Sequence, residues 1–191
     1  NGDAISGIYA DLLREVKKDG CQFNFTTVPR ARLELMFESG SADLLLPSTR
    51  TPRRDELGIF VPMIKSRATV ISLAANHLDL KTTQELIARK DLRLVLVRGY
   101  DFGPTYQSLA AELTQQGRVF LEPDALSVAR MLKTSSNYLT ITAPSIFVGA
   151  ITEDPRVRDL TDKLSFTPLN ELPWGESGIY ISKTSLGKDD K

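Results

Sequence analysis

Residues 40–56 read Gly-Ser-Ala-Asp-Leu-Leu-Leu-Pro-Ser-Thr-Arg-Thr-Pro-Arg-Arg-Asp-Glu, and this stretch decides the fold. Gly40 is the type of residue that ends a helix, and Ala42–Leu46 carries apolar side chains on both faces of a short strand. Such a run is typical of a parallel strand that helices cover on both sides. The polar, arginine-rich segment Pro47–Arg54 follows directly. Because α/β proteins bind ligands beyond the carboxyl ends of buried strands, we predict an α/β fold with a candidate site in this segment.

The residues before Gly40 alternate between the patterns of a helix and a strand. Apolar residues from Ile5 to Val16 recur at the spacing of one helical face, and Gly20 stands where that helix would end. We predict a strand over Gln22–Val28 and a second helix whose first turn begins at Pro29. The resulting order of helix, strand, helix and strand is that of an α/β unit.

A second α/β series follows a polar crossover. Ala68–Ala74 is predicted to be extended, Ala75–Leu80 to cross between lobes, and Thr82–Glu85 to open a helix with a capping box. Later strands are predicted at Leu92–Val97, Arg118–Leu121, Asn137–Thr142 and Ser177–Ser182, with helices between the first three. We therefore predict two lobes: residues 1–74 with 168–191, which include the hinge strands, and residues 75–167.

Composition excludes several classes of function. The 191 residues carry 24 basic and 24 acidic side chains, so no net field favours nucleic acid or an anionic membrane. Cys21 is the only cysteine and His77 the only histidine, so an intramolecular disulfide and a thiolate metal site are both ruled out. No apolar run is long enough to span a bilayer. We expect no metal and no cofactor.

Residues 40–63 resemble the family 3 bacterial extracellular solute-binding proteins, which are polar amino-acid type periplasmic binding proteins of ABC transporters. In that family a Gly-ended helix, an Asp before a buried strand, a Thr-x-x-Arg turn and a Phe-x-x-Pro segment occur in this order. Gly7–Leu13 is similar to the family's first helix, and Val97–Tyr100 is similar to its second-lobe strand and turn. The resemblance implies a periplasmic binding protein type II-like fold, with two α/β lobes joined by a hinge and a ligand cleft between them. It also implies that the chain is truncated at both ends relative to the family.

The resemblance implies that Arg54 pairs with a carboxylate of the ligand. A guanidinium matches a carboxylate with two parallel hydrogen bonds, and the pair strengthens where water is excluded. Thr49 offers a hydroxyl or a backbone N–H beside the same carboxylate, or else it only stabilises the turn. Arg50 is a further candidate, whereas Arg53 is expected to face solvent.

On the second lobe, Gly99, Tyr100 and Asp101 precede a predicted helix and are candidates to face the ligand. Asp101 also suits a helix N-cap, and Tyr100 suits either ligand stacking or packing on its lobe. Thr142 occupies the place where amino-acid-binding members have an acid that holds the ammonium group. A threonine hydroxyl forms hydrogen bonds but does not neutralise a cation. We therefore expect a carboxylate ligand without an α-ammonium, or one whose ammonium meets a different acid.

These observations predict an extracytoplasmic solute-binding protein that captures a small polar, carboxylate-bearing or amino-acid-like molecule for an ABC-type importer. We expect a periplasmic monomer that delivers its ligand to a membrane permease, has no enzymatic activity and derives from a precursor with a signal peptide. The alternatives are a ligand-sensing domain of a signalling receptor and a dehydratase-like enzyme on the same fold. The enzyme would need Asp101 or Glu176 as its general acid or base.

Overall fold

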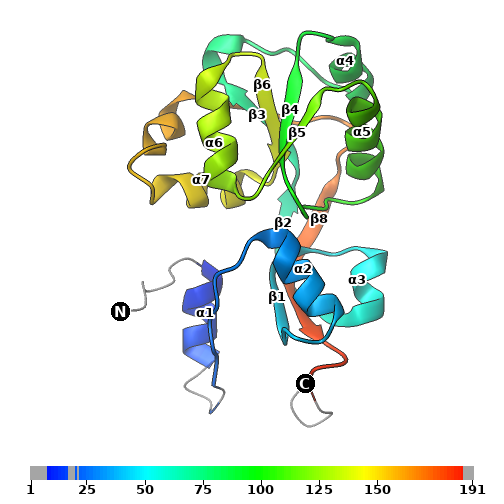
Figure 1. The fold of residues 1–191 in the computed structure, drawn as a ribbon, viewed down its shortest axis with the longest axis vertical. Helices are drawn as coiled ribbons and strands as arrows, with labels where there is room; N and C mark the ends of the chain where they lie inside the picture. Colours follow the sequence, from blue (N-terminus) through cyan, green and yellow to red (C-terminus); the bar gives the residue numbers. More distant parts are fainter. Residues whose placement is uncertain (1–7, 17–19, 21, 187–191) are drawn as a thin grey trace.

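The computed structural model describes residues 8–16, 20 and 22–186. Within them the chain forms two lobes, stacked along the long axis of the molecule and joined by two extended strands (Figure 1). The small lobe is built on a three-stranded sheet, and the large lobe on a five-stranded sheet. None of the helices in the described ranges combines the length and the hydropathy that a membrane span requires.

The small lobe has an antiparallel sheet in the order β1-β8-β2. Its core is formed by Phe37, Leu45 and Tyr180, each at most 1% exposed. Phe37 and Tyr180 meet edge to face with ring centroids 6.2 Å apart. The elements of this lobe are α1 (Ile8–Val16), α2 (Arg30–Glu38), β1 (Leu44–Thr49), α3 (Pro52–Leu57), β2 (Gly58–Arg67) and β8 (Trp174–Ser182).

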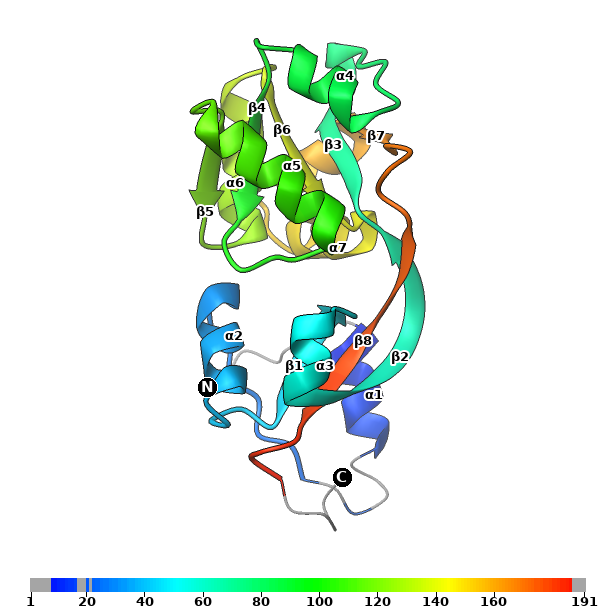
Figure 2. The same ribbon diagram turned by 90° about the vertical axis from the view of Figure 1, so that its right-hand side faces the viewer.

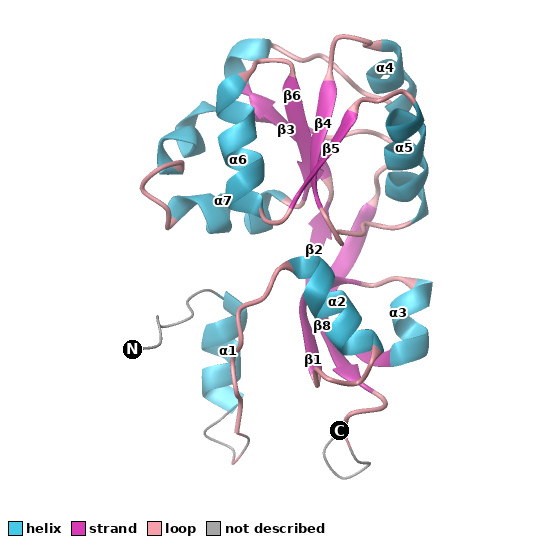
Figure 3. Cartoon of the chain, in the orientation of Figure 1, coloured by secondary structure: helices cyan, strands magenta, loops and turns pink. Residues whose placement is uncertain are grey.

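The large lobe has its sheet in the order β5-β4-β6-β3-β7, in which β4 is parallel to both β5 and β6. Helices α4 and α5 cover one face, and α6 and α7 the other (Figure 3). The elements are β3 (Thr69–Leu73), η2 (Ala74–Asn76), α4 (Thr83–Ala88), β4 (Arg93–Val97), α5 (Pro104–Gln115), β5 (Val119–Glu122), α6 (Ala125–Thr134), β6 (Tyr138–Thr142), α7 (Pro144–Thr152), η3 (Arg158–Lys163) and β7 (Leu164–Thr167).

Strand β4 is apolar after its first residue because both of its faces are covered. Leu94 and Leu96 belong to the core beneath α4 and α5, whereas Val95 and Val97 belong to the core beneath α6 and α7. Successive side chains of a strand point to opposite faces, so an unbroken apolar run is what this position requires. The capping box predicted at Thr82–Glu85 is confirmed at the start of α4.

Strands β2 and β8 connect the lobes. They pair from Gly58 opposite Ser182 to Arg67 opposite Trp174, and they run side by side between the two lobes in Figure 2. The guanidinium of Arg67 donates to the carbonyl oxygens of Leu169 and Leu172, which ties the far end of β2 to the large lobe.

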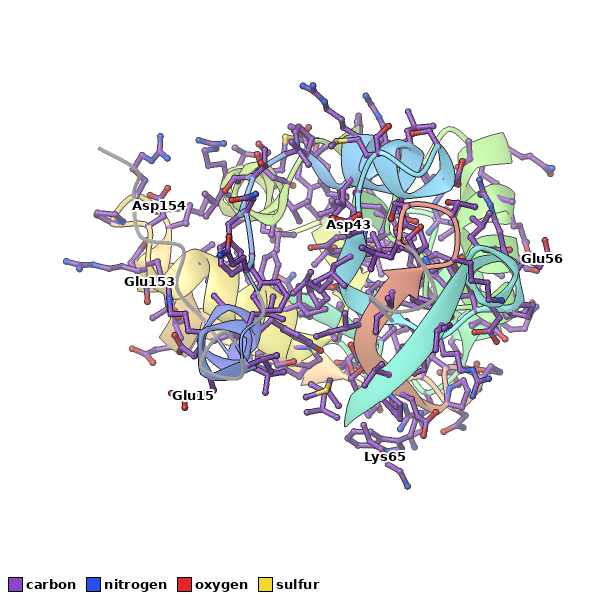
Figure 4. The ribbon with its side chains drawn as sticks, turned by 90° about the horizontal axis from the view of Figure 1, so that it is seen from below. Glu15, Asp43, Glu56, Lys65, Glu153 and Asp154 are labelled. Carbon is purple, nitrogen blue, oxygen red and sulfur yellow. The ribbon has the colours of Figure 1, made fainter. Side chains whose placement is uncertain are left out.

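Charged side chains surround the outside of the molecule. Viewed from the small-lobe end, Glu56, Lys65, Glu153 and Asp154 lie around its periphery (Figure 4). Lys65 projects from β2, which is an edge strand of the small-lobe sheet. A lysine on an edge strand opposes pairing with another chain, so this position is consistent with protection of that edge.

Three predictions from the sequence are corrected by the sheet pairing. Gln22–Val28 forms no strand, because within the described residues no neighbouring strand meets its N–H and C=O groups. The strand predicted at Ala42–Leu46 begins at Leu44, and it pairs antiparallel rather than parallel, since β8 returns beside it. The predicted boundaries of the first lobe are wrong at two places: Ala68–Ala74 contains β3, which pairs with β6 and β7 in the large lobe, and Leu169 and Leu172, at the start of 168–191, belong to the core of the large lobe.

One further segment differs from its prediction, and two other predicted features lie outside the described residues. The polar segment Pro47–Arg54 includes the first turn of α3, because Thr51 caps a helix that begins with Pro52. Cys21 and the residues before Ile8, where the first helix is predicted to begin, lie outside the described residues.

Gly178 is required at the centre of the small-lobe sheet. It pairs with Ser48 on one side and Pro62 on the other, and both neighbouring strands change register at this level. A Cβ atom on Gly178 would lie 2.0 Å from the carbonyl oxygen of Val61, which is backbone and has no flexible alternative. The neighbouring backbone therefore leaves no room for any side chain at Gly178.

We expect Gly178→Ala to lower the free energy of unfolding by about 2 kcal/mol, because the added methyl group overpacks the sheet. Urea denaturation followed by circular dichroism measures this change. Gly175→Ala is the matched control on the same strand, since no atom lies within 4 Å of the Cβ it would add. Equal stabilities of the two variants would contradict this explanation of the sheet.

Candidate functional site

A cavity of about 350 Å³ lies between the two lobes. The small lobe contributes the start of α2, the end of β1 and Arg54 of α3. The large lobe contributes the loop after β4, the loop after β5, and α7. Most of the wall is apolar, and its apolar residues are Val28, Pro29, Leu33, Leu46, Pro47, Val97, Phe102, Pro123, Ala125, Leu126, Ile146 and Ala150.

The topology of the large lobe explains the position of this cleft. Strands β4 and β5 are parallel, so their carboxyl ends meet at the same edge of the sheet. Val97 is the last residue of β4, and Pro123 follows the last residue of β5. Both face the cleft, which is where open α/β sheets carry their ligands.

Arg54 lies on the small-lobe wall of the cleft, and its side chain is 6% exposed. Its Nη1 donates to the carbonyl oxygen of Thr49 at 2.9 Å, and its Nη2 donates to Oε1 of Glu34 at 2.7 Å. Its Nε donates to the other oxygen of Glu34 at 3.3 Å. A carboxylate of the chain itself therefore already meets this guanidinium, which sequence reasoning did not anticipate.

The helix that carries Arg54 is fixed by its cap and by Tyr180. The hydroxyl of Thr51 accepts the backbone N–H of Arg54 at 3.4 Å. The hydroxyl of Tyr180 accepts the N–H of Thr51 at 3.1 Å and donates to Asp55 Oδ1 at 2.8 Å. Burial raises the pKa of Tyr180 to about 12, so the hydroxyl keeps the proton that it donates. Tyr180, a residue of the small-lobe core, therefore fixes the short helix α3 by contacts with Thr51 before Arg54 and with Asp55 after it.

Thr49 lines the cleft, but Arg50 does not. Thr49 contributes its carbonyl oxygen to Arg54. Arg50 is exposed, pairs with Asp55 at 3.1 Å, and lies over the ring of Phe60 at 5.8 Å from its centroid. The structure thus separates these two neighbouring candidates, because successive residues leave the end of a strand in opposite directions.

Tyr100 and Asp101 line the cleft from the large lobe. Burial raises the pKa of Tyr100, whose ring meets Phe102 edge to face at 5.9 Å. Asp101 accepts the N–H of Gly103 at 2.8 Å and the side-chain amide of Gln107 at 2.9 Å. Its carboxylate therefore shapes the loop before α5, while Gly103 takes the N-cap position itself.

Gly99 does not line the cavity but brings the two lobes together. Its φ is +87°, and a Cβ atom there would lie 2.9 Å from both the Cα and the N of Ala31 in α2. The loop after β4 thus approaches the backbone of the small lobe (Figure 2). Gly99, a candidate to face the ligand, thus lies against the opposite lobe instead.

Thr142 lies at the end of β6 and is 2% exposed. It is not among the residues that line the cleft, and its Oγ1 has no hydrogen-bond partner within the described residues. The structure therefore does not bring Thr142 together with Arg54.

Three further residues lie at or beside the cleft. Arg30 lines the cleft, and Glu34 forms ion pairs with both Arg30 and Arg54. The spacing of four residues between Arg30 and Glu34 in a predicted helix is a sequence signal for an ion pair. Asp124 lines the opposite wall and accepts the N–H of Ser127 at 2.7 Å as the N-cap of α6. An aspartate just before a predicted helix is the signal for this role.

Within the described residues, no three His, Cys, Asp or Glu side chains gather in a way that would hold a metal ion. The cleft instead offers guanidinium groups on one wall, two carboxylates on the other and apolar surface between them. This arrangement suits a small organic molecule that carries a charged group.

No family model and no curated protein sequence matches the chain. Solved structures do match it. An amino acid ABC transporter substrate-binding protein from Streptococcus pneumoniae, bound to L-arginine, is 16% identical with a TM-score of 0.68 over 92% of this chain and 70% of that one. Holo ArgBP from T. maritima is 15% identical with a TM-score of 0.69 over 93% and 73%.

A third similar structure comes from a receptor. The iGluR3 LBD of Pleurobrachia bachei in its glycine complex is 12% identical, with a TM-score of 0.70 over 96% of this chain and 75% of that one. The chain therefore has the periplasmic binding protein type II-like fold, in which two α/β lobes enclose a cleft, as the sequence predicts.

Proposed function

We propose that this chain is an extracytoplasmic solute-binding protein that captures a small carboxylate-bearing molecule for an ABC-type importer. The observation that carries the proposal is the buried guanidinium of Arg54 at the wall of a cleft between two lobes. On this proposal the protein is a periplasmic monomer and delivers its ligand to a membrane permease. The likeness in fold to an amino acid ABC transporter substrate-binding protein supports it.

Arg54 is suited to this role because its position is fixed before a ligand arrives. Three of its contacts are internal, and a guanidinium has further N–H donors to offer a ligand. In a cleft with mainly apolar walls, such a charge-assisted pair is stronger than in water. Thr49, Tyr100 and Asp101 complete the proposed set of ligand-facing residues.

Lobe closure about β2 and β8 is the proposed mechanism. A ligand held between Arg54 and the loops of the large lobe contacts both lobes only when they are close together. It therefore stabilises the closed state by contacts that an open state lacks. The backbones of the two lobes approach each other closely where Gly99 lies against Ala31.

The geometry favours a binding protein over an enzyme. Of the two acids considered for catalysis, Asp101 accepts two hydrogen bonds within its own loop, and Glu176 lies on β8 opposite Lys65, outside the cleft. A sensing domain of a signalling receptor is the second candidate, since the receptor domain that binds glycine shares this fold. Binding of this chain to a membrane permease would favour the importer over the sensor.

We expect a thermal-shift screen of amino acids, monocarboxylates, dicarboxylates and short peptides to find a stabilising ligand. A ligand at about a hundred times its Kd adds roughly 2.7 kcal/mol to the free energy of unfolding. Arg54→Ala should weaken its binding by about 100-fold, because a buried charged partner is lost. Arg54→Lys, which keeps the charge but loses the planar fork, should bind with intermediate affinity.

Arg53→Ala is the control from the same turn. Arg53 is exposed and pairs with Glu38 on the surface, so its removal should leave the affinity unchanged. If a ligand is found and Arg54→Ala binds it as tightly as the wild type does, the assignment of the site is wrong.

Gly99→Ala should oppose closure, because its Cβ atom would meet the backbone of α2. With the ligand from the screen at saturation, small-angle scattering should show a larger radius of gyration for Gly99→Ala than for the wild type. Gly103→Ala is the matched control: its φ of +96° imposes the same backbone strain, but no atom lies within 4 Å of its Cβ. The same compaction in both variants would argue against closure at this point.

A further inference from the structure

The first turn of α2 holds a second guanidinium against the cleft, beside that of Arg54. Arg30 Nε donates to Oε1 of Glu34 at 2.8 Å, and Arg54 Nη2 donates to the same oxygen at 2.7 Å. The other end of the Arg30 guanidinium contacts β1, where Nη1 donates to the carbonyl of Pro47 and Nη2 lies 3.4 Å from Ser48 Oγ. Both arginines line the cavity.

This cluster carries more positive than negative charge. Its side chains are 11% exposed for Arg30, 6% for Arg54 and 17% for Glu34. Across residues 22–186, Glu34 is the only carboxylate that pairs with either guanidinium. Buried ions are stable when an opposite charge meets them, and here two cations share one anion. One positive charge at the cleft wall is therefore left for an anion to neutralise.

The ionisation of Arg30 is consistent with this excess. Burial lowers the pKa of its guanidinium, Glu34 opposes that effect, and the nearby Arg54 lowers the pKa further. The negative charge of an anion bound at the cluster would offset both of these effects by attracting the charged form of Arg30.

The rest of the cleft limits what the anion is attached to. The opposite wall presents Asp101 and Asp124, so a second anionic group would meet like charges there. An α-ammonium would lie next to the bound carboxylate and therefore near both guanidinium groups, whereas Asp101 and Asp124 lie on the opposite wall and already accept hydrogen bonds from their own loops. The remaining wall is mainly apolar and accommodates an uncharged body.

We propose that Arg30 and Arg54 jointly bind a single carboxylate group, that Glu34 positions both guanidinium groups, and that the cleft selects a monocarboxylate with an uncharged body. This inference rests on the proposed function, because it takes the cleft to be the ligand site. Arg30 is then a ligand-contacting residue, and Glu34 is a positioning residue.

A matched series of five-carbon probes tests the ligand class. Calorimetric titration of the wild-type chain at constant ionic strength and neutral pH compares pentanoate, L-norvaline, glutarate and pentanamide. We expect pentanoate to bind about tenfold or more tightly than each of the others, which is the effect of one additional charge-assisted hydrogen bond or of one avoided repulsion. Tighter binding of L-norvaline or glutarate, or no binding of pentanoate, would overturn the inference.

Failure of the inference is distinguishable from failure of the proposed function. If L-norvaline or glutarate binds and Arg54→Ala abolishes that binding, the cleft is the ligand site but the inferred ligand class is wrong. If no compound of the broader screen binds, the proposed function itself fails.

Substitutions of Arg30 and Glu34 test their two roles, because they should change the affinity for pentanoate in opposite directions. Arg30→Gln should weaken pentanoate binding by about tenfold or more, because one guanidinium is lost. Glu34→Gln should strengthen it, since the cluster then carries two uncompensated charges; a residue with only a structural role would weaken binding or leave it unchanged. Arg32→Gln, at an exposed position of the same helix, is the control and should bind as the wild type does.

Circular dichroism shows whether each variant is folded. If Glu34→Gln is unfolded, Arg30→Lys tests the same cluster, because it keeps the charge and loses the fork. It should bind pentanoate more weakly than the wild type and more tightly than Arg30→Gln. Unchanged affinity in both Arg30 variants would exclude Arg30 from the site.

Discussion

A buried guanidinium needs hydrogen-bond acceptors or an opposite charge around it, and the arrangement of the small-lobe wall supplies both to Arg54. Arg54 is held at its position by the carbonyl of Thr49 and the carboxylate of Glu34. Glu34 in turn joins it to Arg30, which β1 holds from the other side. The result is a positively charged wall in a cleft whose lining is mainly apolar. In a medium that excludes water, such a wall attracts an anion more strongly than an exposed arginine does.

The two lobes contribute to the cleft in different ways. The small lobe provides charged side chains from a helix start and a short helix, and the core around Tyr180 fixes that short helix. The large lobe provides loops at the carboxyl ends of parallel strands, whose position follows from the sheet order. Strands β2 and β8 connect the lobes as a pair, so the ends of this pair are the natural place for a change of angle between them.

Much of this fold is predictable from the sequence because its cause is local. The apolar run at β4 indicates a strand covered on both faces, and the capping box at Thr82 and Glu85 marks the start of α4. The direction of β1 was not predictable. Three consecutive leucines indicate burial, but the antiparallel pairing is set by β8, which lies more than a hundred residues further along the chain. The error at Gln22–Val28 has a related cause, since a strand pattern forms a strand only where a partner is present.

In the candidate site too, local features were predictable from the sequence and contacts between distant segments were not. Arg54 was predictable because its motif places it after a buried strand, and the structure places it on the cleft. Arg50 and Arg54 have the same chemistry, and only the fold separates them: Arg50 is exposed and pairs with Asp55, whereas Arg54 is buried and pairs with Glu34. The sharing of Glu34 between Arg30 and Arg54 joins α2 to α3, and no pattern within either segment specifies that contact.

The most direct measurement is a crystal structure of the protein with the ligand found by screening. We predict closed lobes and a ligand carboxylate about 2.7–2.9 Å from the Arg54 guanidinium, which is the usual length of such a charge-assisted bond. A ligand bound outside the cleft, or one whose carboxylate faces solvent while Arg54 contacts only Glu34 and Thr49, would contradict the central role of this guanidinium.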